Sequence, residues 1–403
     1  MVAIFDHPNH MEPLLPSSGR ELLAWLSKEC ISKIGRLTGQ VHSEVTRSKI
    51  AGVVRSMNCY YSNLIEGHKT VPRDIERALL SDFSPDLAKR ENQELSAAHI
   101  ALEAKMVGRL AGGEVDIYDP GFICWLHREF YSQLPEAFRA AKTQTGKKYT
   151  IEPGKYRDFM VDVGRHTPPG FGSLQKFIGR FCEFYKGTHP RILETDRLVA
   201  IAAAHHRLSW IHPFGDGNGR VARLYTHALL TKHDLGGDGL WTLSRGLARQ
   251  KDKYFQALET ADQPRTGDLD GRGNLTDRGL AGFCIFFLET ILDQVEFMGS
   301  RLDLPGLKGR IERYFQGETG GMYGKKPEFL MRVVRALAEE GEFHRGKVQE
   351  ITGRSESSCR ETIKQGLAGG LFTSPSPKGV LQIAFPAKVL DSYFPKLFLD
   401  LDV

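Results

Sequence analysis

A short stretch near the middle of the chain combines most of the groups that a phosphate site needs. Residues 212–220 read His-Pro-Phe-Gly-Asp-Gly-Asn-Gly-Arg, and Arg223 follows. The glycines allow positive φ angles, so successive backbone N–H groups can point into one concavity. The two arginines lie three residues apart, at neighbouring positions on a helix face, where both can reach a polyphosphate.

The residues after Gly219 predict a helix, because apolar side chains recur there at helical spacing (Val221, Leu224, Ala228 and Leu229). The N-terminus of a helix carries unpaired N–H groups and the positive end of the helix dipole, which favour a bound anion. The loop and the helix together therefore predict an anion site.

Two side chains of this stretch could take part in chemistry. Asp216 offers a carboxylate to a hard cation such as Mg²⁺, which binds through few carboxylates plus substrate phosphates. His212 stands at the mouth of the loop and can accept a proton. The simpler alternative is a glycine-rich loop between two core helices, with Asp216 as a capping residue.

Residues 212–223 resemble the motif of the Fic family, H-P-F-x-D/E-G-N-G-R-x-x-R, at every fixed position. The resemblance implies a mainly α protein with a helical Fic core and a small β-hairpin flap. It implies an enzyme that moves AMP from ATP to a Ser, Thr or Tyr hydroxyl of a target protein or of itself. It also implies a homodimer.

The resemblance assigns a role to each side chain of the loop. His212 would be the catalytic base, Asp216 would hold Mg²⁺, and Phe214 would anchor the loop from below. The ATP phosphates would contact a set of loop and helix residues: Gly217, Asn218, Gly219, Arg220 and Arg223.

A second motif lies at the end of a predicted helix over residues 44–66. Residues 62–67 read Ser-Asn-Leu-Ile-Glu-Gly, which resembles the inhibitory motif S/T-x-x-x-E-G of one class of Fic proteins. There Glu66, together with Ser62, would oppose Arg223 and block the γ-phosphate. The alternative is an ordinary helix C-terminus with an exposed glutamate.

Residues 146–170 contain short extended pieces with turns, which predict a hairpin. This segment resembles the family's flap, so the 156–169 segment would pair with an extended segment of the target protein. Val163 and Gly164 would lie against the nucleotide and the target side chain, with Val161 as the competing candidate. A purely structural hairpin is the alternative.

Further candidate residues come from outside the loop. Tyr254 is the best candidate for a contact on the nucleotide side, although an aromatic residue here could also belong to the core. Asp262 stands where some relatives have asparagine, which leaves its sugar contact open. His127 lies on a predicted helix and is interpreted as a satisfied core or surface histidine. His205 and His206 lie on another and are interpreted as packing or supporting residues.

The chain divides into three predicted parts. Residues 1–112 form an N-terminal helical region with the inhibitory helix, residues 113–304 the catalytic core, and residues 305–403 a unit that resembles a winged helix. A linker predicted over 316–327 suggests that the core folds without this unit.

The C-terminal unit could contact DNA or a protein. Ser355 would N-cap its second helix, where Arg354, Arg360 and Lys364 could reach phosphates. From residue 305 onward, 15 Lys and Arg face 12 Asp and Glu, a weak excess for a DNA-binding unit. Packing on the core or on another protein remains equally open.

The composition is that of an ordinary globular protein, with 41% hydrophobic and 26% charged residues. A net charge of +5 does not by itself indicate nucleic acid binding. The six cysteines are scattered, which predicts reduced thiols. No signal peptide or membrane span is expected, so the sequence predicts a cytoplasmic protein.

Three other functions remain open at this stage. The chain could transfer a different group such as UMP, phosphate or phosphocholine, although Gly219 before Arg220 argues against phosphate transfer. It could remove AMP, with Glu66 positioning a water molecule. It could also be a DNA-binding regulator with a subordinate Fic core.

Overall fold

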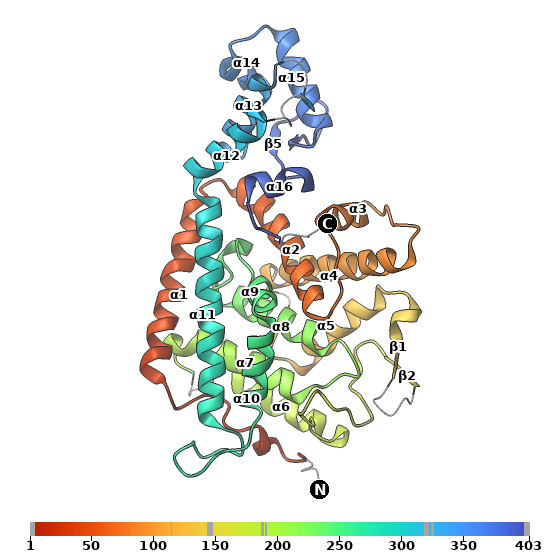
Figure 1. The fold of residues 1–403 in the computed structure, drawn as a ribbon, viewed down its shortest axis with the longest axis vertical. Coiled ribbons are helices and arrows are strands. Elements are labelled where there is room, and N and C mark those ends of the chain that lie inside the picture. The colour runs from red at the N-terminus through yellow and green to blue at the C-terminus, as the bar shows by residue number, and fades with distance from the viewer. Residues whose placement is uncertain are drawn as a thin grey trace.

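The computed structural model describes residues 5–113, 115–142, 148–186, 189, 192–317, 322–323 and 326–398. It is mainly helical, as the sequence predicts, and carries two small antiparallel sheets among the described residues (Figure 1). The N-terminal region contributes four helices: α1 (Arg20–Gln40), α2 (Glu44–Ile65), α3 (Pro72–Leu79) and α4 (Leu87–Ala111).

The middle of the chain supplies the core that carries the motif loop. Its elements are α5 (Pro120–Ser132), β1 (Ala140–Lys142), β2 (Lys148–Thr150), α6 (Leu174–Tyr185), α7 (Arg197–Ile211), α8 (Asn218–Lys232), α9 (Leu243–Arg249), α10 (Lys251–Ala261) and α11 (Asp277–Leu302). Helix α7 is buried on almost every side and packs against α6, α8 and α11. Helix α7 is thus the central helix of the core, and it ends directly before His212.

Helix α2 has the bounds that its sequence predicts, within one residue. The Ser43 hydroxyl caps its first turn by accepting from the Thr46 N–H at 3.2 Å. Glu66 is the C-cap residue, and Gly67 follows with a φ of 91°, a left-handed conformation that favours glycine. The helix therefore stops where Glu66 can turn toward α8.

Val71 occupies the N-cap position of α3, and the Thr70 hydroxyl donates to the Asn92 carbonyl at 3.1 Å. One expectation in this part of the chain needs correction, because the predicted flap is less regular than a hairpin. Its bridge joins Val163 to His166, whereas the regular ladder of β2 pairs with β1 upstream.

The C-terminal unit follows the predicted order of helix, helix-turn-helix and extended pieces. Its elements are α12 (Leu304–Gln316), α13 (Pro327–Glu340), β3 (Glu342–Phe343), α14 (Lys347–Thr352), α15 (Glu356–Ala368), β4 (Phe372–Thr373), β5 (Leu381–Ile383) and α16 (Ala387–Tyr393). The strands form one antiparallel sheet in the order β3-β5-β4. Ser355 occupies the N-cap position of α15, but its side chain makes no capping hydrogen bond.

The C-terminal unit packs against the N-terminal helices and is not joined to the rest of the chain by a linker alone. Helix α16 contacts α3, and β5 contacts α2 (Figure 1). Beyond α16 the chain runs back to the core, where the Leu397 carbonyl accepts from the Tyr61 hydroxyl at 3.1 Å. Arg245 donates to the Lys396 carbonyl at 2.9 Å. That the core folds without residues 305–403 stays a prediction, and these contacts show that truncation would also uncover part of α2.

Leu397→Ala should test how much this tail contributes to stability. Leu397 is only 1% exposed, so its truncation should lower the free energy of unfolding by about 2–5 kcal/mol. Leu269→Ala is the matched control, because this leucine is 86% exposed and should change stability by no more than about 0.5 kcal/mol. Denaturant titration measures both, and equal effects of the two variants would contradict a docked tail.

None of the described helices combines the length and hydropathy that a membrane span requires.

Candidate active site

The motif loop connects the C-terminus of α7 to the N-terminus of α8 through two left-handed residues. His212 has φ and ψ of 48° and 61°, and Gly217 has a φ of 77°. A Cβ at Gly217 would meet the Tyr131 ring at 2.8 Å, so glycine is required there by space as well as by φ. This path places the first turn of α8, with its unpaired N–H groups, beside His212.

The first two carbonyl groups of the loop are held by Arg157. Its Nε donates to the His212 carbonyl at 2.9 Å, and its backbone N–H donates to the Pro213 carbonyl at 2.9 Å. Arg157 was absent from the sequence-based candidates. The sequence indicates its role only weakly, because a lone arginine in an irregular segment does not show which group it will contact.

The next two carbonyls are held by Asn218 and Tyr149. The Asn218 amide closes a ring on Phe214, accepting from its N–H at 2.9 Å and donating to its carbonyl at 2.8 Å. The Tyr149 hydroxyl donates to the Gly215 carbonyl at 2.7 Å. The carbonyls of His212, Pro213, Phe214 and Gly215 therefore all have partners, which fixes the path of the loop into α8.

Asp216 is held by two residues of α5, four positions apart. The Tyr131 hydroxyl donates to Oδ2 of Asp216 at 2.6 Å. His127 Nε2 donates to the Asp216 carbonyl at 3.3 Å, while its Nδ1 accepts from the Gly154 N–H at 2.8 Å. His127 is thus a satisfied, buried histidine that also holds the loop, a contact that the sequence does not indicate, and the sequence-based candidates did not include Tyr131.

Phe214 lies beneath the loop, as predicted. It is fully buried and stacks on the His127 ring with 4.0 Å between centroids and 10° between planes. Partial burial would raise the pKa of Asp216, but the Tyr131 hydrogen bond and the Arg220 charge outweigh this and lower it. The carboxylate is therefore ionised near neutral pH, as a Mg²⁺ ligand must be.

Arg223 and the end of α2 form a close pair. Arg223 Nη2 donates to Glu66 Oε1 at 2.6 Å and to the Ser62 carbonyl at 2.9 Å. Its Nε donates to Ser62 Oγ at 2.9 Å. The Arg223 side chain is 3% exposed and that of Glu66 is 32% exposed. Both residues of the predicted inhibitory motif therefore meet the predicted arginine.

The Glu66 carboxylate also lies directly over the N-terminus of α8. A Cβ at Gly219 would collide with Glu66 Oε1. Burial would raise the pKa of Glu66, but the charges of Arg223 and Arg220 lower it below its ordinary value. Glu66 is thus an anion seated where a helix N-terminus favours one.

Arg220 lies beside this carboxylate with spare hydrogen-bonding capacity. It is 6% exposed, and its guanidinium carbon lies 5.2 Å from the centre of the Phe130 ring. In the part of the chain that the structure describes, Arg220 Nε has no hydrogen-bond partner. A buried donor without a partner is costly, so a phosphate oxygen would relieve it.

A cavity of about 380 Å³ joins several of the predicted residues, a volume ordinary for a small-molecule site, whereas Asp216, Gly217 and Arg220 are not among its lining residues. Its walls include Glu66, Val163, Gly164, His212, Gly219, Arg223 and Tyr254. Val161 is not among the lining residues, so the geometry favours Val163.

Tyr254 presents its ring and not its hydroxyl to this cavity. The residue is 2% exposed, and its hydroxyl is bonded to His205 Nε2 at 2.8 Å. Asp262 also lines the cavity and pairs with His206 Nε2 at 3.2 Å. The predicted supporting roles of both histidines agree with these contacts.

His212 is half-buried and lines the cavity near the first turn of α8. Burial, followed by the nearby charges of Arg157 and His166, lowers its pKa to about 4. The imidazole is therefore neutral at physiological pH and available as a base.

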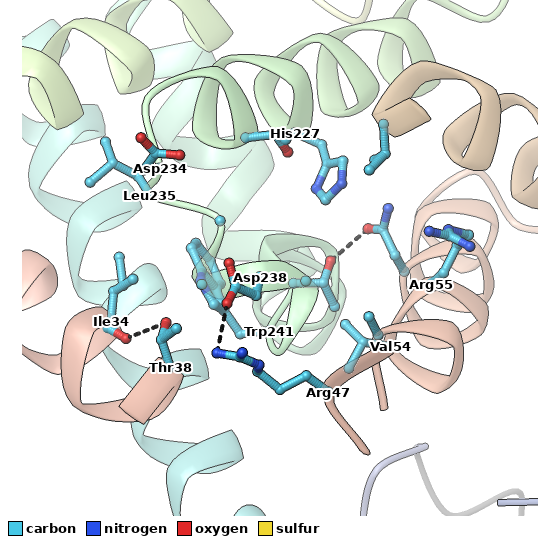
Figure 2. A pocket seen from close by; sticks show the side chains of 18 of the residues that line it. Ile34, Thr38, Arg47, Val54, Arg55, His227, Asp234, Leu235, Asp238 and Trp241 are labelled. Atoms are coloured by element: carbon cyan, nitrogen blue, oxygen red, sulfur yellow. Dashed lines mark hydrogen bonds and ion pairs between the residues drawn. The ribbon is translucent and has the colours of Figure 1, made fainter. Parts of the chain in front are cut away.

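A second cavity, of about 780 Å³, lies between α1, α2, α4 and α8 (Figure 2). Arg47 bonds to Asp238 at its rim at 3.3 Å, and the Thr242 hydroxyl donates to the side-chain amide oxygen of Asn58 at 2.6 Å. No predicted site residue lines it. The motif chemistry therefore locates the candidate site in the smaller cavity.

The segment that carries the motif loop is similar to known proteins. Residues 118–230 match the model of the Fic/DOC family. A protein adenylyltransferase Fic from Nematostella vectensis is 38% identical over 87 residues, 22% of this chain and 20% of that relative. One from Culex quinquefasciatus is 29% identical over 191 residues, 47% of this chain and 33% of that relative.

The fold of this chain is similar to that of a solved structure, a Fic family protein from Desulfovibrio desulfuricans. The TM-score is 0.51 at 16% identity, and the match covers 89% of this chain and 96% of that one. Residues 118–230 of this chain therefore form a Fic/DOC family domain. The chain spans only a fifth to a third of the length of the curated relatives above.

Proposed function

We propose that this chain is a protein adenylyltransferase that transfers AMP from ATP to a Ser, Thr or Tyr hydroxyl of a target protein or of itself. The observation that carries the proposal is that a neutral His212 and the N-terminus of α8 line one cavity. A base and an anion site must be this close for in-line attack on a phosphate.

The reaction follows from the positions of these groups. His212 accepts the proton of the target hydroxyl. The oxygen then forms a bond to the α-phosphorus of ATP, the bond from that phosphorus to the bridging oxygen breaks, and pyrophosphate leaves. Backbone N–H groups at the start of α8 stabilise the developing charge, and one such donor can contribute about 3 kcal/mol.

The remaining residues hold the nucleotide. Arg220 and Arg223 face the β- and γ-phosphates, and Tyr254 packs its ring on the nucleotide side. The side-chain amide of Asn218 is engaged with Phe214, so its predicted α-phosphate contact falls to its backbone N–H.

Mg²⁺ fits the donor set at Asp216. A single ionised carboxylate beside the phosphate site suits an ion that takes its other oxygens from water and phosphates. When bound, Mg²⁺ would neutralise phosphate charge. Tyr131 and His127 orient Asp216 for this role.

Three further parts of the proposal rest on the family resemblance. The target protein would dock on the 156–169 flap, where Val163 is exposed. The chain would form a homodimer, which light scattering can measure. The C-terminal unit would contact DNA or a protein, although Arg360 on α15 pairs with Glu356 and has less free charge than the sequence suggests.

The proposal is tested by the intact mass of the purified chain after incubation with ATP and Mg²⁺. We expect a gain of one or more AMP groups in the Glu66→Gly variant, with little gain in the wild type. Parallel incubations with UTP and with a phosphocholine donor separate the other transfer reactions. Modification by one of those donors but not by ATP would overturn the choice of AMP.

Asp216→Ala should abolish the Mg²⁺ dependence of ATP binding together with transfer. The reason is that the nucleotide would keep its contacts to α8 but lose the carboxylate that anchors the ion. Calorimetry with and without Mg²⁺ measures the binding. Asp234→Ala is the control, since Asp234 lines the other cavity. An Asp216→Ala chain that kept both properties would place the ion elsewhere.

A further inference from the structure

Arg157 joins three parts of the site through one guanidinium group. The residue is 4% exposed and lies in the segment between β2 and α6. Its Nε donates to the His212 carbonyl at 2.9 Å, its Nη1 to the Phe159 carbonyl at 2.9 Å, and its Nη2 to the Pro169 carbonyl at 2.6 Å. Each nitrogen of the fork therefore has a different backbone partner.

The partners of Arg157 are unusual for a buried cation. Among the described residues, the partners of its guanidinium are backbone carbonyls and not carboxylates, and burial lowers the pKa of Arg157 to about 10. Burying a cation without a counter-ion is costly, and carbonyl dipoles offset that cost only where the geometry is good. A planar fork can meet three separated carbonyls at once, whereas an ammonium is a compact point charge.

The three carbonyls belong to the two parts of the site that must come together in the proposed reaction. Phe159 and Pro169 lie at the two ends of the segment whose turn carries Val163, and His212 is the proposed base. The tip of the segment has its own tether, since His166 Nε2 bonds to the Trp210 carbonyl at 2.7 Å. Arg157 thus fixes both ends of the 159–169 segment against the residue at the end of α7.

His212 needs such a support because of its backbone. It adopts a left-handed conformation with a φ of 48°, which is uncommon for a residue other than glycine. A residue in this region keeps its conformation only when neighbouring contacts impose it. The hydrogen bond from Arg157 to the His212 carbonyl is a contact of this kind.

We propose that Arg157 is a positioning residue that fixes the position of the catalytic base relative to the target-docking segment. This inference rests on the proposed function. A hydroxyl presented by a target on the 159–169 segment would reach His212 at the correct distance because one side chain fixes both. If this relative position is lost, the rate of transfer should fall while ATP still binds.

The charge of Arg157 gives a second, separable effect. The charged or titratable groups that bear on His212 are Arg157, His166 and Asp216, and burial is the largest influence. Removing the Arg157 charge should raise the pKa of His212, whereas a lysine would keep a positive charge nearby. The two substitutions therefore separate charge from geometry.

The experiment uses the full chain in the Glu66→Gly background, with Arg157→Lys and Arg157→Ala. Both variants should transfer AMP about 10²-fold more slowly at nearly unchanged ATP affinity, as for a reacting group misplaced by about 1 Å. Added guanidinium ion should partly restore Arg157→Ala. The pH at which transfer reaches half its maximum should rise in Arg157→Ala and stay low in Arg157→Lys.

Arg207→Lys is the matched control, because Arg207 is also a fully buried arginine that donates to a backbone carbonyl, that of Pro13 at 2.8 Å. If Arg207→Lys loses stability and transfer to the same extent as Arg157→Lys, Arg157 is merely structural and the proposal is wrong. Full transfer by Arg157→Lys would also overturn it.

A measurement without turnover separates this inference from the proposed function. NMR titration of the His212 ring reports its pKa in the wild type and in both Arg157 variants. If the Glu66→Gly chain transfers nothing, the proposed function fails, yet a raised His212 pKa in Arg157→Ala alone would still support the positioning contact. An unchanged pKa in that variant would overturn it.

Discussion

His212→Ala should abolish AMP transfer while leaving ATP binding nearly intact. The imidazole lines the cavity, and burial lowers its pKa to about 4, so it is neutral near physiological pH and can serve as the proposed base. The anion site, in contrast, is formed by α8 and its arginines. Loss of a general base typically lowers a rate by about 10² to 10⁴. Single-turnover transfer in the Glu66→Gly background measures the rate, and calorimetry measures ATP affinity.

His42→Ala is the control for this experiment, because His42 is exposed. It should transfer AMP like its parent. A His212→Ala chain with the parent's rate would show that another group takes the proton. A variant that no longer bound ATP would instead place His212 in the phosphate cradle.

The sequence predicts well those features that depend on neighbouring residues. The repeat of apolar side chains and the glycine stop give α2 its bounds, and this places Ser62 and Glu66 on its last turn. The glycines of the motif likewise predict the turn into α8. In both cases the physical signal, helical spacing or a left-handed residue, lies within the segment itself.

Contacts between distant segments could not be predicted in this way. Tyr131, Tyr149 and Arg157 hold the loop from positions 55 to 85 residues away from their partners. Nothing in a lone tyrosine or arginine states which carbonyl it will meet. The same reason explains the β2 ladder, since an extended segment does not identify the strand that it pairs with.

Asn218 shows a subtler limit. Its place in the motif suggested a phosphate ligand, and an amide between glycines at a helix start is suited to that role. The structure instead engages its amide with both backbone groups of Phe214. A side chain that shapes a site and one that binds its ligand have the same sequence signature.

Glu66→Gly should raise self-modification with ATP by about 10²-fold, the factor expected when a misaligned group moves by about 1 Å. Glu66 puts an anion over Gly219 and neutralises part of the Arg223 charge. ATP would then bind with its phosphates displaced, and the α-phosphorus would not face the incoming hydroxyl. Incorporation of labelled AMP, with a time course of intact mass, measures the gain.

The contacts of Arg223 explain why this variant should gain activity. Ser62 holds Arg223 through Oγ and through its carbonyl, independently of Glu66. Removing the carboxylate therefore frees the charge of Arg223 without releasing its side chain. Arg223→Ala should not activate, because it also removes a phosphate ligand.

Three further variants separate the charge of Glu66 from its bulk and from the hold of Ser62 on Arg223. Glu66→Gln keeps the bulk and removes the charge, while Glu66→Asp keeps the charge and shortens the reach, so both should activate only partly. Ser62→Ala keeps the carboxylate and should activate least. If Glu66→Gly gains no transfer to itself or to any lysate protein, inhibition by α2 is wrong. If it instead loses an AMP-removing activity of the wild type, Glu66 positions a water molecule in hydrolysis, and AMP removal becomes the better assignment.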